Sequence, residues 1–259
     1  MPVSTSPNVS RRLVLGVAAL AIAASASMAS AGPRGWFSGD KIKGNGSFKK
    51  QSRELAHFTG LSLGLHGNVE LHIGNTESVS IETDDNLLPL IETVIEDGVL
   101  KIRPTKKHMN LETSHMKIVV QAKSIDRIAL GGSGSIEADA LRGAKLQFDI
   151  GGSGSMHIKS VESDSVSVNV GGSGNFSSAG SAAKLSVSIG GSGNVQAGQM
   201  AANDVSANIA GSGKATVWAK NKLNLTIAGS GDVDYYGDPA VSKTVAGSGS
   251  ANHLGSAPK

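Results

Sequence analysis

The sequence has no cysteine among its 259 residues and only 3% aromatic residues. The absence of cysteine excludes a disulfide framework, a thiolate metal site and a cysteine nucleophile. With so few rings, a buried core has to be built from aliphatic side chains, and a hydrophobic content of 39% is enough to build one. Glycine is plentiful at 34 residues, yet this composition fits neither a helical bundle nor a Gly-X-Y collagen repeat.

The chain also has no large excess of basic over acidic residues or of acidic over basic ones. Charged residues make up 17% of the chain, and the formal net charge is +3. Residues 1–31 contribute two arginines and no acid, which leaves 22 basic residues (24 minus 2) against 21 acidic ones. Nucleic-acid binding requires a basic surface. We therefore expect no nucleic-acid partner.

The N-terminal residues have the three parts of an export signal. Arg11 and Arg12 provide the positive segment, residues 13–24 are uncharged and mostly apolar, and residues 29–31 read Ala-Ser-Ala. The apolar run is shorter than the ~20 residues that span a bilayer, so cleavage is favoured over an uncleaved anchor. The sequence predicts a signal peptide over residues 1–31. The protein is then periplasmic, at the cell surface or secreted, with no transmembrane segment in the mature chain.

Gly-Ser-Gly tripeptides recur through the second half of the chain at spacings of 18 to 20 residues. A fixed period of this length is typical of a solenoid, in which successive coils stack on one another. Glycine suits the corners because it allows close approach to the next coil, and each serine hydroxyl is expected to bond nearby backbone or the next serine. The seven serines predicted to mark these structural turns are Ser133, Ser153, Ser173, Ser192, Ser212, Ser230 and Ser248.

Aliphatic residues occupy alternate positions on either side of the turns, which is the period of a β-strand with one buried face. Three residues before the turn serines stand Leu130, Ile150, Val170, Ile189, Ile209, Ile227 and Val245. Five residues before them stand Ile128, Phe148, Val168, Val187, Ala207, Leu225 and, as the one exception, Lys243. The sequence therefore predicts an all-β fold, a single-stranded parallel β-helix (β-solenoid) with coils of about 18–20 residues.

The regular repeats occupy residues 124–255. Residues 53–123 show the same alternation with irregular turns, and we expect them to form the first coils and a cap of one domain over residues 53–255. A cap is needed because an open solenoid end exposes unpaired strand edges, through which two chains could also associate. Residues 32–52, with several glycines and lysines, are expected to be a flexible linker.

Five motifs stand out in the N-terminal part: Leu61-x-Leu63, Gly67-Asn68-Val69-Glu70-Leu71-x-Ile73, Ser78-Val79-x-Ile81-Glu82-x-Asp84-x-Asn86-Leu87-Leu88, Ile91-Glu92-Thr93 and Glu96-Asp97-Gly98-x-Leu100-x-Ile102. Together with the Gly-Ser-Gly turns, they resemble the bacterial auto-transporter adhesin, head GIN domain family over roughly residues 53–255. The resemblance implies an exported right-handed parallel β-helix with an adhesion-like role. It implies no catalytic residue.

Small polar residues fill the outward positions between the buried columns. In stacked coils they form a flat surface of hydrogen-bonding groups, which serves either for solubility or as a binding face for a glycan or cell-envelope polymer. The candidate binding residues are Ser167, Asn169, Ser186, Ser188, Ser206, Asn208, Asn224 and Thr226.

No residue pattern points to a reaction or to a cofactor. The seven histidines lack H-x-x-x-H or H-x-H spacing, and the acidic residues around Gly237 do not match a calcium loop. We predict no catalytic residue, no metal site and no cofactor, and hence a non-enzymatic binding protein. The alternative is a carbohydrate-active β-helix enzyme that would use the carboxylates of Glu82, Asp84 and Asp85.

Overall fold

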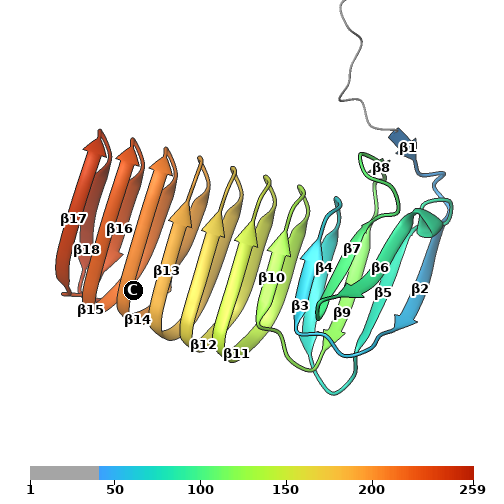
Figure 1. The fold of residues 1–259 in the computed structure, drawn as a ribbon, viewed down its shortest axis with the longest axis horizontal. Helices are drawn as coiled ribbons and strands as arrows, with labels where there is room; N and C mark the ends of the chain where they lie inside the picture. Colours follow the sequence, from blue (N-terminus) through green and yellow to red (C-terminus); the bar gives the residue numbers. More distant parts are fainter. Residues whose placement is uncertain (1–40) are drawn as a thin grey trace, which may run out of the picture. The chain divides into compact units, whose positions relative to one another are not determined.

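The computed structural model describes residues 41–259. The predicted signal peptide and residues 32–40 of the predicted linker lie outside the described residues. The described part is almost entirely β-strand, with one short 3-10 turn, η1 (Leu88–Leu90). The predicted β-solenoid of stacked parallel coils is confirmed (Figure 1).

Five long strands each run around most of one coil. They are β11 (Ser135–Ile150), β12 (Ser155–Val170), β13 (Asn175–Ile189), β14 (Asn194–Gly211) and β15 (Lys214–Gly229). Each strand pairs in parallel with the next. Three shorter strands continue the stack: β16 (Asp232–Tyr236), β17 (Ala240–Gly247) and β18 (Ser250–Gly255).

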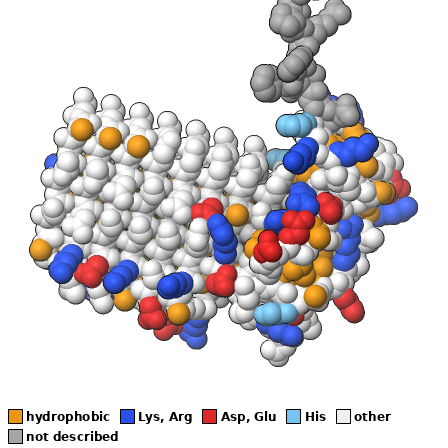
Figure 2. Space-filling model, in the orientation of Figure 1, with side chains coloured by type: hydrophobic (Ala, Val, Ile, Leu, Met, Phe, Trp, Pro, Cys, Tyr) orange, Lys and Arg blue, Asp and Glu red, His pale blue; other side chains and the backbone are white. Residues whose placement is uncertain are grey.

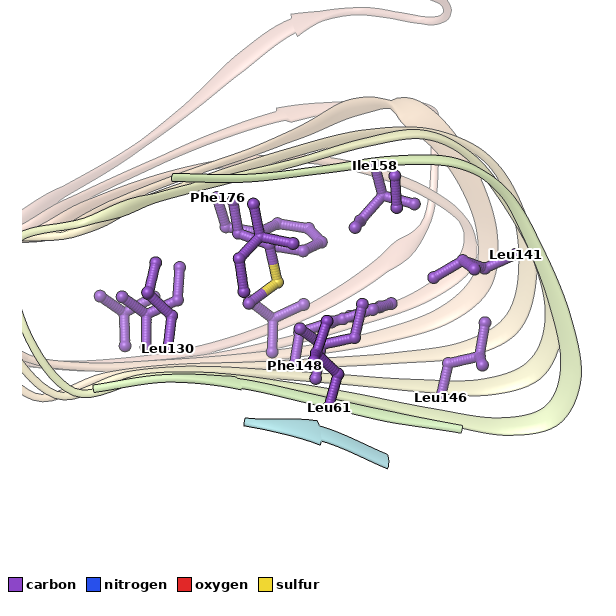
Figure 3. Packing of buried hydrophobic residues seen from close by; sticks show 14 of the residues in the cluster. Leu61, Leu130, Leu141, Leu146, Phe148, Ile158 and Phe176 are labelled. Atoms are coloured by element: carbon purple, nitrogen blue, oxygen red, sulfur yellow. The ribbon is translucent and has the colours of Figure 1, made fainter. Parts of the chain in front are cut away.

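Each coil is flattened into two walls whose aliphatic side chains point toward one another (Figure 3). The predicted columns are in register: Leu130 pairs with Ile150 and Ile150 with Val170, and all three are at most 1% exposed. Stacking of like residues gives every coil the same core, and burial of each large aliphatic side chain contributes about 1.5 to 3 kcal/mol. The core therefore grows coil by coil.

The columns end at β17, because no described strand covers its outer edge. Val241 is 44% exposed there, although it continues the buried column of Leu223. Lys243 occupies the inward position next to Leu225 and is also exposed. An inward-pointing charge at an open edge opposes strand addition by another chain. Association through the solenoid ends stays a prediction.

The opposite end of the stack is built from short strands. Their bounds are β3 (Gly60–Leu63), β4 (Asn68–Ile73), β5 (Ser78–Asp84), β6 (Ile91–Glu96), β7 (Val99–Pro104), β8 (Asn110–Glu112), β9 (Lys117–Ala122) and β10 (Arg127–Leu130). β3 and β4 form one coil. On one side it pairs with the coil of β10 and β11, and on the other side with the coil of β7 and β9. The stacking order therefore differs from the sequence order.

Antiparallel strands close this end of the solenoid. β6 pairs antiparallel with β7 on one wall, and β5 pairs antiparallel with β9 on the other. A strand in the reverse direction cannot continue a parallel coil, so the solenoid stops here (Figure 1).

The predicted linker over residues 32–52 is wrong for residues 41–52. β1 (Lys41–Lys43) pairs with β8, and β2 (Phe48–Glu54) pairs with β5 along all 7 of its residues. Most side chains of β2 are exposed, and two are lysines. A strand at a sheet edge tolerates such polar residues because only one side of it is paired. That composition is what made the segment resemble a linker.

The Gly-Ser-Gly turns stack through their backbones. Ser192 donates its N–H to the carbonyl oxygen of Gly172 at 3.1 Å, and Asn194 donates to that of Gly174 at 3.0 Å. The side chains of all seven turn serines are exposed. In the part of the chain that the structure describes, none of their hydroxyls is hydrogen-bonded, so the expected hydroxyl bonds between coils are wrong. The glycines make the turn, and the serine faces water.

Candidate functional site

The predicted binding residues lie on one wall of the solenoid. We call it the serine-rich wall; it consists of residues 144–150, 164–170, 183–189, 203–209 and 221–227. The eight residues form two ladders in register across four coils. The first ladder is Ser167, Ser186, Ser206 and Asn224; the second is Asn169, Ser188, Asn208 and Thr226.

The polar atoms of these ladders face solvent. Asn169 donates to the Asp149 carboxylate at 2.8 Å, and that carboxylate also accepts from Arg127 at 3.1 Å. Within residues 41–259 the other seven ladder side chains make no hydrogen bond. Their hydroxyl and amide groups are thus available to a ligand.

Charge is confined to the edges of the serine-rich wall. Figure 2 shows a wall with few charged side chains across it and a line of them along its lower edge. One ladder at the start of the wall holds four charged residues and one serine: Lys145, Ser165, Lys184, Asp204 and Lys222. A ligand on the wall meets mostly neutral hydrogen-bonding groups.

A groove lies on the opposite wall, which consists of residues 135–140, 155–160, 175–180, 194–200 and 214–218. Its volume is about 360 Å³. Sequence reasoning missed this groove, because it considered only the outward residues that precede each turn. The available signal was the change in turn spacing from 20 to 19, 20 and 18 residues, which marks coils of unequal length.

The three carboxylates of the enzyme alternative each have partners of their own, and Glu82 lies 3.1 Å from the His115 ring nitrogen. Asp84 accepts hydrogen bonds from the Gly46 N–H at 2.5 Å and from the Thr113 hydroxyl at 2.5 Å. Asp85 accepts from Asn45 at 2.6 Å and forms an ion pair with Lys49 at 3.2 Å. These hydrogen bonds lower the pKa of both aspartates. A general acid needs a raised pKa, so the site does not support the enzyme alternative.

Asp84 instead ties the N-terminal strands to the cap. It is only 2% exposed and joins the β1–β2 loop to Thr113, which precedes β9. Its pKa is lowered chiefly by the Thr113 hydroxyl. A carboxylate with a folded-state pKa below its unfolded value of about 3.9 stabilises the fold above that pH, and the stabilisation is lost as pH falls through the folded-state pKa.

We expect Asp84→Asn to lower the melting temperature at pH 7, because one partner then faces an amide nitrogen in place of a carboxylate oxygen. The difference from wild type should shrink below about pH 4, where Asp84 of the unfolded chain begins to take up a proton while the folded chain still holds the carboxylate. Melting curves from pH 7 to pH 3 measure this. A difference that stays constant over this range would contradict the role of the charge.

The described residues contain no group of three histidine, aspartate or glutamate side chains placed to hold a metal ion. The acidic residues around Gly237 bond protein partners: Asp232 accepts from Ser250, and Asp234 accepts from Asn252 and pairs with Lys214. No helix among residues 41–259 has the length and apolar character of a membrane span.

Solved structures share the fold. A putative adhesin from Bacteroides fragilis is 23% identical, with a TM-score of 0.76, and the match covers 82% of this chain and 100% of that one. A putative lipid binding protein from Parabacteroides distasonis is 26% identical, with a TM-score of 0.71, and the match covers 83% of this chain and 100% of that one. A putative adhesin from Parabacteroides merdae is 23% identical, with a TM-score of 0.65 and coverage of 83% and 99%.

No curated protein matches the chain. The model of one protein family does match it, over residues 57–239, and the description of that family is "Putative auto-transporter adhesin, head GIN domain". This range includes the cap and most of the regular coils. The resemblance seen in the motifs is confirmed, and the chain belongs to this head GIN domain family.

Proposed function

We propose that this chain is an exported, non-enzymatic protein of the cell envelope that binds a glycan or another envelope polymer through its serine-rich wall. The family description and the predicted signal peptide both favour a place outside the cytoplasm. A non-enzymatic role is favoured by the engaged carboxylates, whose aspartate pKa values are lowered where an acid catalyst would need a raised one.

The observation that carries the proposal is the register of the two polar ladders. Equivalent groups repeat along the stack at about 4.8 Å, the spacing of neighbouring β-strands. A polymer laid along the stack therefore meets several similar hydrogen-bonding groups at once. Each contact is weak, but their sum raises the affinity through multivalency, which a small molecule cannot exploit.

The test is binding of the full chain to purified bacterial peptidoglycan and to cell-envelope polysaccharide. Ser186→Ala alone should weaken binding less than about threefold, since a neutral hydrogen bond contributes about 0.5 kcal/mol or a little more. The fourfold variant Ser167→Ala, Ser186→Ala, Ser206→Ala and Asn224→Ala should weaken it by more than about tenfold.

A matched control removes the same kind of group elsewhere. The fourfold variant Ser153→Ala, Ser173→Ala, Ser192→Ala and Ser212→Ala deletes four exposed turn hydroxyls. It should bind like wild type. Loss of binding by Ser186→Ala alone, or equal loss in the two fourfold variants, would contradict binding through the repeated wall.

A further inference from the structure

We propose that the groove on the opposite wall is a binding site for one uncharged sugar residue of a glycan, bordered by the ring of Tyr236. The groove is lined by His157, Lys159, Ser177, Ser178, Ala179, Gln196, Gly198, Gln199, Thr216 and Tyr236. This inference rests on the proposed function in one respect, the choice of a glycan as the partner. It assigns a separate site on the other side of the solenoid.

Unequal coil lengths create the groove. The pairing register shifts between Ile158 and Val161 in β12, between Ser177 and Ala179 in β13, and between Ala197 and Ala201 in β14. These three shifts follow one another in the same part of successive coils. β-Bulges redirect side chains and recur beside functional sites. Here they interrupt an otherwise flat wall at one place.

Tyr236 reaches across the groove from two coils away. It pairs with Trp218 in β15, yet its ring lies over Gly198 in β14. A Cβ atom added to Gly198 would lie 3.4 Å from the Tyr236 ring and 3.0 Å from the Thr216 methyl group. The glycine therefore lets the ring lie close against the β14 backbone, where any larger residue would push the ring out of place. An aromatic ring with polar groups close to it suits a sugar, which presents an apolar C–H face and a rim of hydroxyls.

The polar lining supplies both donors and acceptors without free charge. Gln196 and Gln199 contribute amides, and Thr216 contributes a hydroxyl. Lys159 is the only lysine, arginine, aspartate or glutamate in the lining, and its ammonium group lies 2.6 Å from the Asp139 carboxylate. With that charge balanced, the groove favours a neutral polyol over an anionic ligand.

The probe set is neutral hexasaccharides of glucose and of N-acetylglucosamine, with anionic polygalacturonate for comparison, titrated calorimetrically into the full chain. We expect at least one neutral hexasaccharide to bind. Tyr236→Ala should weaken this binding by about tenfold, while Tyr236→Phe, which keeps the ring, should stay within about threefold of wild type. Gly198→Val, whose side chain would displace the Tyr236 ring, should abolish it.

The fourfold serine-wall variant serves as the control, and Tyr236→Ala should weaken hexasaccharide binding by about the same factor in that background as in wild type. The experiment thereby distinguishes a groove that does not bind sugar from a serine-rich wall that does not bind polymer. Melting curves confirm that each variant is folded. Absence of hexasaccharide binding at millimolar concentration, unchanged binding by Tyr236→Ala, or preference for polygalacturonate would overturn the proposal.

Discussion

Val187→Asp is expected to destabilise the protein by about 4 kcal/mol, or about 10 °C in melting temperature. Val187 is 0% exposed and stacks between Val168 and Ala207 in one column. A carboxylate at this position has no cation within the core and cannot reach water, so its desolvation is uncompensated. Because the column continues into the coils on both sides, the substitution also weakens their packing on one another. Thermal and urea unfolding of the purified variant measure it.

The adjacent substitution Ser188→Asp is the matched control. Ser188 points outward and is exposed, between Asn169 and Asn208 of the neighbouring coils. The same carboxylate there remains hydrated, and we expect a change within about 0.5 kcal/mol. Equal loss of stability in the two variants would contradict the inward and outward assignment of the wall.

Gly193→Ala is expected to destabilise by about 2 to 3 kcal/mol, although it adds only a methyl group. Gly193 is buried in the turn, and a Cβ atom there would lie 2.8 Å from the Gly174 carbonyl oxygen and in contact with the Val170 side chain. The backbones cannot separate, because Asn194 donates to that same carbonyl oxygen at 3.0 Å. Chemical denaturation gives the free energy of unfolding directly.

Gly190→Ala makes the same chemical change three residues earlier in the same turn. A Cβ atom on Gly190 would lie 3.9 Å from the Val170 carbonyl oxygen, an ordinary contact. We expect it, like Ser192→Ala, to change stability by no more than about 0.5 kcal/mol. If Gly190→Ala and Gly193→Ala were equally tolerated, the tight stacking of the turns would be wrong.

The regular coils could be predicted from sequence because one local rule repeats. Each turn places Ile150, Val170 and Ile189 at the same offset, so sequence spacing translates directly into parallel register. The eight outward residues of the serine-rich wall followed from the same rule. Alternation reports which face of a strand is buried, and here it did so correctly.

The cap could not be predicted to the same depth. The alternation in β5 would be the same in a parallel or an antiparallel pair, so its antiparallel pairing cannot be predicted from the pattern. The placement of the β3 and β4 coil between two others depends on long-range packing. β2 was not predicted as a strand, because an edge strand with exposed lysines has the composition of a linker.

The groove could not be predicted from the sequence for a different reason. Its residues come from five successive coils, and the departure from strict periodicity in three of them creates it. Tyr236 lies over Gly198, 38 positions earlier in the chain, only because two coils separate them. A pattern read along one strand cannot show such a contact.

The proposed function depends on binding of a polymer through repeated groups on the serine-rich wall. The most direct test compares the affinity of the full chain for a polysaccharide with its affinity for the corresponding disaccharide. We expect the polymer to bind at least tenfold more tightly per binding site, with little dependence on salt, and the fourfold serine-wall variant to lose this advantage. Equal affinity for polymer and disaccharide in the wild-type protein would contradict it.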